Sequence, residues 1–137
     1  MRIFLDANVL YAASCSKTGA SFAIFELKKR FKFEFITSQL ALIEAERNLT
    51  EKEELEEINN FYLLIKKIKV VKSENEKAKK MFKGLIKEKD APILYAAIKS
   101  KSSYLLTLDK KHFFTGKIKK LKLPIKILTP GQFIKEL

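Results

Sequence analysis

The stretch Arg2-Ile3-Phe4-Leu5-Asp6 places an acidic residue directly after a short apolar run. Runs of this kind, rich in branched and aromatic residues, are typical of buried strands. Similar runs recur at residues 33–36, 68–71, 104–108 and 125–128. Each stretch between them exceeds the dozen or so residues that a parallel crossover needs and shows helical patterning. This alternation of strands and helices predicts a parallel sheet.

The predicted fold class is α/β, a three-layer α/β/α sandwich with five mainly parallel strands and helices on both faces. We expect residues 1–137 to form a single domain, because no repeat, low-complexity tract or Gly/Ser-rich linker interrupts the chain. Such sheets bind ligands at the carboxyl ends of their strands, near the point where the strand order reverses. That edge is where functional residues are expected.

Several helix starts can be predicted from capping signals. Two pairs fit the capping box, in which a hydroxyl and a carboxylate bond to free backbone amides; they are Thr50 with Glu53, and Ser73 with Glu76. A further helix should follow Asp90, with Pro92 tolerated in its first turn, and a short last helix should follow Thr129-Pro130-Gly131.

The chain is strongly basic, with 28 Lys plus Arg against 16 Asp plus Glu and a net charge of +12. Positive charge of this size favours polyanions as partners, and the alternative is the Lys/Glu-rich surface of a thermophile protein. Residues 110–135 hold eight Lys and no acid, whereas residues 44–57 hold seven Glu. This distribution indicates one face for a polyanion and another that is acidic, unless both are simply solvated helix faces.

Composition also excludes several classes of protein. The longest apolar run, Ile93 to Ile98, is far shorter than the roughly 20 residues of a membrane-spanning helix, so no membrane association is expected. No amino-terminal signal peptide is expected, because Asp6 and Asn8 interrupt the apolar start, and a lone Cys15 suits a reducing compartment. A cytoplasmic location is therefore predicted. The isolated glycines match no Walker loop or dinucleotide fingerprint.

The acids most relevant to function are the three Asp residues, since the chain has 13 Glu but only Asp6, Asp90 and Asp109. Asp6 and Asp109 follow predicted strands, and Asp90 opens the helix that leads into the strand before Asp109. All three are thus expected at one rim of the sheet. Like charges about 4 Å apart repel by several kcal/mol, and a bound cation would relieve that repulsion. The alternative is that each Asp only caps a helix.

A fourth acid is expected from the helix after residues 33–36. Glu44 and Glu46 point about 160° apart around that helix, so only one of them can face the rim. Periodicity does not decide between them, because the helix is apolar nearly all round.

Carboxylate ligands suit Mg²⁺ or Mn²⁺, and the absence of a Cys/His cluster argues against zinc. The only histidine, His112, is expected to be a surface or packing residue rather than a ligand, and Cys15 is not expected to act as a nucleophile.

At this point the motifs resemble a known family. Leu5-Asp6-Ala7-Asn8-Val9-Leu10 is similar to the first motif of PIN-domain nucleases, and the segments at residues 90–97 and 106–109 are similar to their later acidic motifs. The ending Thr129-Pro130-Gly131 also fits, so the resemblance spans nearly the whole chain. It departs from the pattern at Leu108, where small residues are frequent.

The resemblance implies a catalytic metal site made by Asp6, Glu44, Asp90 and Asp109, with Mg²⁺ or Mn²⁺ as cofactor. It favours Glu44 over Glu46, because Glu44 stands six residues after Ser38. Asn8 and Thr107 match positions that often support the site.

The implied activity is hydrolysis of RNA phosphodiester bonds, as in toxin ribonucleases of the VapC type. An antitoxin protein and a second copy of the chain would then be partners. Nearby Lys89, Lys110 and Lys111 would hold the flanking RNA backbone, unless they are ordinary solvated lysines. The alternatives are an RNA-processing nuclease and a binding module without turnover. The sequence of the RNA target cannot be inferred, since lysine contacts to phosphate carry no sequence information.

Overall fold

The structure is a computed structural model that describes residues 1–137. Its centre is a five-stranded, entirely parallel sheet with the strand order β3-β2-β1-β4-β5. The strands are β1 (Arg2–Leu5), β2 (Glu34–Ser38), β3 (Ile68–Val71), β4 (Tyr104–Leu106) and β5 (Lys126–Leu128). The predicted sheet is confirmed: β1 and β3 have the expected bounds, and the other three strands differ from them by one or two residues at an end.

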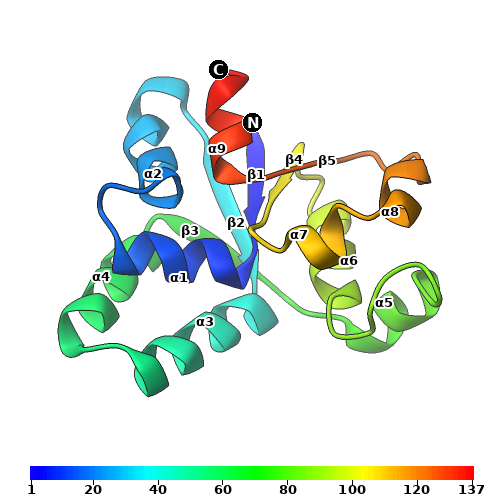
Figure 1. The fold of residues 1–137 in the computed structure, drawn as a ribbon, viewed down its shortest axis with the longest axis horizontal. Helices are drawn as coiled ribbons and strands as arrows, with labels where there is room; N and C mark the ends of the chain where they lie inside the picture. The colour runs from blue at the N-terminus through cyan, green and yellow to red at the C-terminus, as the bar shows by residue number, and fades with distance from the viewer.

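Helices fill every connection between the strands. They are α1 (Ala7–Cys15), α2 (Ala20–Phe31), α3 (Gln39–Lys52), α4 (Leu55–Ile65), α5 (Asn75–Met81), α6 (Ala91–Lys99), α7 (Lys110–Phe113), α8 (Gly116–Lys120) and α9 (Pro130–Lys135). In Figure 1, α1 to α4 lie to the left of β1 and α5 to α8 lie to its right. Because parallel crossovers are right-handed, the two groups cover opposite faces of the sheet.

The predicted starts of α6 and α9 are confirmed. Asp90 is the N-cap residue of α6, which carries Pro92 in its first turn. Thr129 caps α9 through its hydroxyl, in a capping box with Gln132.

The two predicted capping boxes are wrong. Thr50 lies inside α3, where its hydroxyl donates to the carbonyl of Glu46, and the helix that follows is capped instead by the pair Glu54 and Glu57. The Ser73 hydroxyl accepts a hydrogen bond from the backbone N–H of Leu40, so it links two segments instead of capping α5. The Thr50 hydroxyl bonds within its own helix, and the Ser73 hydroxyl bonds to a residue 33 positions away. Local sequence spacing does not reveal either partner.

The core is a single cluster of 31 buried apolar residues along both faces of the sheet. One part of it is aromatic. Phe133 of α9 makes edge contacts with Phe33 and with Tyr104, at ring-centroid distances of 5.4 and 4.9 Å. These contacts pack the last helix against the starts of β2 and β4. No helix combines the length and the apolar character needed to cross a membrane.

The substitution Phe133→Ala should therefore lower the free energy of unfolding by about 3 to 5 kcal/mol, because it empties a fully buried site. Phe31→Ala is the matched control. Its ring also stacks on Phe33 but is 39% exposed, so the loss should stay near 1 kcal/mol. Urea denaturation measures both, and equal losses would contradict this packing.

Candidate metal centre

The site begins at the junction of β1 and β4, which is also where the strand order reverses. Leu5 pairs with Leu106, and the backbone N–H of Asp6 donates to the carbonyl of Leu106 at 3.0 Å. This register brings Asp6 beside Thr107, whose hydroxyl donates to Asp6 Oδ2 at 2.7 Å. Asp6 also caps α1 by accepting from the N–H of Ala7. The first carboxylate is thus fixed by two adjacent strands.

Asn8 and Thr107, the predicted supporting residues, both bond to Asp6. Asn8 Nδ2 lies 3.3 Å from Asp6 Oδ2 and from Thr107 Oγ1, and Asn8 Oδ1 accepts from the N–H of Leu108 at 2.9 Å. The Thr107 hydroxyl also accepts from the N–H of Asp109 at 3.1 Å. One buried hydroxyl therefore connects Asp6 to the turn that carries Asp109.

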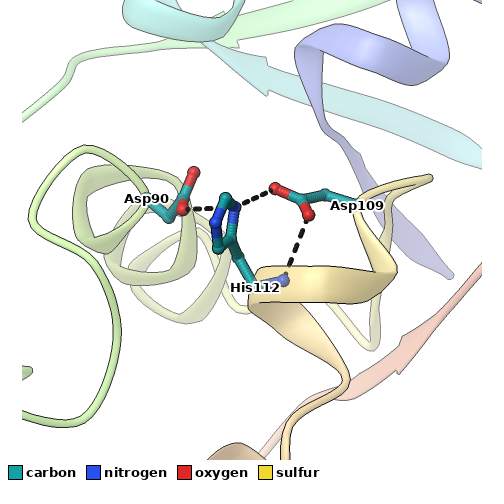
Figure 2. A group of neighbouring side chains, drawn as sticks. All are labelled: Asp90, Asp109 and His112. Carbon is teal, nitrogen blue, oxygen red and sulfur yellow. Dashed lines mark hydrogen bonds and ion pairs between the residues drawn. The ribbon is translucent and has the colours of Figure 1, made fainter.

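Asp109 and Asp90 meet on either side of His112, as Figure 2 shows. His112 Nδ1 lies 2.7 Å from Asp109 Oδ2 and 3.3 Å from Asp90 Oδ2. Asp109 Oδ1 in addition accepts from the His112 backbone N–H and so caps α7. Asp90 differs from the other two, because its carboxylate makes no capping bond to α6. Helix capping alone therefore does not explain why an acid stands at position 90.

A cleft of about 240 Å³ lies in front of these carboxylates. Residues from four parts of the chain line it, among them Asp6, Glu44, Asp90 and Asp109. The structure thus brings all four predicted acids to one cleft. Glu46 lies elsewhere, because its carboxylate accepts a hydrogen bond from the Tyr62 hydroxyl. Of the two glutamates on α3, Glu44 is the one that faces the cleft.

Burial dominates the electrostatics of the site. The pKa of Asp6 is raised to about 6, mainly by desolvation and to a smaller extent by the carboxylates of Glu44 and Asp90, while the hydrogen bonds from Thr107 and Ala7 lower it. Burial is also the main cause that raises the pKa of Asp90, with Lys89 acting in the opposite direction. Burying these two acids therefore lowers the stability of the fold.

This donor set fits a divalent cation. Asp90, Asp109 and His112 each offer an atom within 4.8 Å of the others, and Asp6 and Glu44 add carboxylates from the same cleft. Asp90 Oδ2 is buried and makes no hydrogen bond, and its contact with His112 Nδ1 at 3.3 Å is shared with the closer Asp109, a condition that a bound cation would relieve. Carboxylates suit Mg²⁺ or Mn²⁺, and the imidazole adds a nitrogen that Mn²⁺ accepts more readily than Mg²⁺.

The three predicted RNA-binding lysines lie in different places. Lys89 lines the cleft, with its ammonium group 4.0 Å from Asp90 Oδ1. Lys111 lines a neighbouring cleft beside His112, and Lys110 is exposed at the start of α7.

His112 is the residue whose place the sequence analysis missed. We expected a surface or packing role, yet it contacts two of the acids. Its spacing of three residues from Asp109 on a short helix is the signal that could have found it. Asn48 and Lys52 also line the cleft, and they could have been found at one and two helical turns beyond Glu44 on α3.

The model of the PIN domain matches residues 2–111, a range that includes all four acids. The chain belongs to the PIN domain family. No curated protein matches the sequence.

Several solved structures share the PIN fold at low sequence identity. The VapBC2 structure from Rickettsia felis, bound to a DNA fragment from its promoter, has a TM-score of 0.70 and 14% identity, over 94% of this chain and 98% of that one. A toxin–antitoxin complex from Klebsiella pneumoniae has a TM-score of 0.64 and 14% identity, over 93% and 97% of the two chains. VapC20 from Mycobacterium tuberculosis, a toxin that cleaves the Sarcin-Ricin loop, has a TM-score of 0.59 and 16% identity, over 80% and 91%.

The raised pKa of Asp6 predicts how the stability of this PIN domain depends on pH. In the folded state Asp6 titrates near pH 6 and in the unfolded state near pH 4, so between these values the folded protein binds more protons. The contribution of Asp6 to the free energy of unfolding must therefore fall as pH rises from 4 to 6 and stay lower above pH 6. Asp6→Asn removes this penalty and should stabilise the metal-free protein by roughly 3 kcal/mol at pH 8, with no gain below pH 4.

Urea denaturation in a chelating buffer between pH 4 and 8 measures this difference. Glu51→Gln, a change at an exposed acid on α3, is the control and should leave the pH profile unaltered. An Asp6→Asn gain that is the same at every pH, or a loss, would be evidence against burial as the source of the shift.

Proposed function

We propose that the protein is a metal-dependent endoribonuclease that hydrolyses phosphodiester bonds of single-stranded or structured RNA, and that it is the toxin of a toxin–antitoxin pair. One observation carries the proposal. Asp6, Glu44, Asp90 and Asp109 come from distant parts of a PIN domain and line the same cleft at its topological switch point. We further propose a cytoplasmic location.

The residues would have distinct roles. Asp6, Asp90 and Asp109 would hold a divalent cation, and Glu44 would complete the site from α3. A cation held by these residues would supply a water of lowered pKa and would offset charge on the scissile phosphate. Thr107 and Asn8 would keep the Asp6 carboxylate oriented through their hydrogen bonds. Lys89 would attract the phosphate to a cleft in which four acids outnumber Lys89 and Lys52.

A protein partner is part of the proposal. Two of the similar structures are described as VapBC2 and as a toxin–antitoxin complex, and a third as a toxin that cleaves the Sarcin-Ricin loop. By this likeness we propose an antitoxin as the partner of this chain. A second copy of the chain is a further proposed partner, which the descriptions of these structures do not mention. An RNA-processing nuclease and an inactive binding module are the competing functions.

Cleavage of a 5′-labelled single-stranded RNA in the presence of Mn²⁺ tests the activity. Asp90→Asn and Glu44→Gln should each lower kcat/KM by about 100-fold or more, because each removes a charge that would hold the cation. Glu46→Gln is the matched control on the same helix and should stay within about 2-fold, since Glu46 bonds to Tyr62 outside the cleft. A chelator should abolish cleavage, and Mn²⁺ should restore it.

Cleavage that continues in the chelator, or at the wild-type rate with Asp90→Asn, would refute a metal-dependent nuclease. A protein that binds RNA in all its forms but cleaves none would instead be the binding module.

The toxin role has its own test in growing cells. Induced expression of the wild-type chain should arrest growth, whereas Asp90→Asn, made at the same level, should not. Growth that continues with a wild-type chain shown to be an active nuclease would favour the RNA-processing alternative.

A further inference from the structure

A second, strongly basic cleft lies directly behind His112. It has a volume of about 730 Å³ and is lined by Lys87, Lys111, Lys117 and Lys120 together with Thr115 and His112. No acid lines it, and none of the four lysines takes part in a salt bridge. We call it the lysine cleft. Ammonium groups gathered in this way repel one another, and a polyanion would relieve that repulsion.

The lysine cleft is joined to the candidate metal centre by two short connections. His112 lines the lysine cleft and also contacts Asp90 and Asp109 (Figure 2). On the other side, the carbonyl of Lys87 accepts hydrogen bonds from the backbone N–H groups of Asp90 and Ala91. The two clefts therefore lie on either side of a thin wall formed by His112 and the turn from Lys87 to Asp90.

The groove on the other side of the metal centre has a different character. It is lined by Arg47, Lys79 and Lys89, but also by the acids Glu44, Glu88 and Asp90. Glu44 and Asp90 belong to the proposed metal site, so Arg47, Lys79 and Lys89 remain against Glu88. This positive excess is smaller than that of the lysine cleft, which has four lysines and no acid, so the lysine cleft attracts a polyanion more strongly.

We propose that the lysine cleft binds the phosphate backbone of the RNA on one side of the scissile bond. The ligand class is a single-stranded nucleic acid held by its phosphates, since lysine ammonium groups are point charges that read no base sequence. That the bound nucleic acid is RNA rests on the proposed function. The protein surface near α7 and α8 would then make the main contact with the RNA outside the metal centre.

Binding of a fluorescent RNA oligonucleotide, measured by anisotropy in a chelating buffer over a range of salt concentrations, tests the proposal apart from cleavage. The variant Lys87→Gln/Lys111→Gln/Lys117→Gln/Lys120→Gln should bind roughly 100-fold more weakly at 0.1 M salt. The slope of log K against log salt should fall by about 2 to 3, because each phosphate contact to a single strand contributes about 0.7.

A second quadruple variant controls for net charge. Lys17, Lys29, Lys66 and Lys69 are exposed, form no salt bridge and lie away from both clefts. Their replacement by Gln should change affinity by less than about 3-fold, since long-range charge effects are screened at this salt concentration. Equal losses in the two variants would overturn the assignment, because binding would then depend on net charge and not on the cleft.

Cleavage separates failure of this inference from failure of the proposed function. At saturating RNA the lysine-cleft variant should keep kcat within about 3-fold while KM rises, because the carboxylates are untouched. Unchanged KM and affinity in an active variant would overturn the lysine cleft alone. A wild-type protein that binds RNA with the predicted lysine dependence but never cleaves it would overturn the nuclease and leave the cleft assignment standing.

Discussion

The site depends on one hydrogen bond between residues 101 positions apart, from the Thr107 hydroxyl to the Asp6 carboxylate. This bond exists only because β1 and β4 lie side by side and in register, so that the ends of both strands reach the same point. Thr107 has a single proton to donate and gives it to Asp6, while its oxygen accepts from Asn8 and from the N–H of Asp109. Every polar group at this junction is thereby used, and the two aspartates take a fixed relative position.

The acids are costly for the fold and valuable for chemistry. A buried carboxylate loses hydration, and a group of carboxylates repels itself. A protein selected only for stability would place apolar or amide side chains at positions 6 and 90. A bound cation would compensate these acids, and the buried Asp90 Oδ2, which makes no hydrogen bond, supports this explanation. Beside them the chain gathers the opposite charge in the lysine cleft, so attraction of a polyanion and coordination of a cation occupy adjacent but separate surfaces.

The five strands and the positions of Asp6 and Asp109 could be predicted from the sequence, because short local patterns of residues indicate them. Apolar runs identified all five strands, and the position of Asp6 and Asp109 after two of them placed both acids at the same edge. Periodicity alone did not show that Glu44 is the acid in the cleft. One side of α3 faces the cleft and carries Glu44, and another side carries Glu46, which bonds to Tyr62. The family pattern favoured it, and the packing of α3 shows why Glu46 points elsewhere.

The remaining features depend on contacts between distant segments, which spacing alone does not reveal. Ser73 bonds to the start of α3 rather than capping the next helix, and His112 meets Asp90 only after α6 and α7 are packed together. The lysine cleft likewise combines side chains from the segment before α6 with others from α7 and α8. Three of these lysines lie in the acid-free stretch 110–135 that the sequence indicates as a polyanion face, whereas Lys87 joins them only in the folded chain.

The most direct measurement is a crystal structure of the wild-type protein soaked with Mn²⁺, with anomalous scattering recorded to locate the ion. We predict an anomalous peak in the cleft, at coordination distance from carboxylate oxygens of Asp90 and Asp109 and facing Asp6. A crystal that shows no peak there at saturating Mn²⁺, with the carboxylates still bonded only to His112 and neighbouring protein groups, would contradict it.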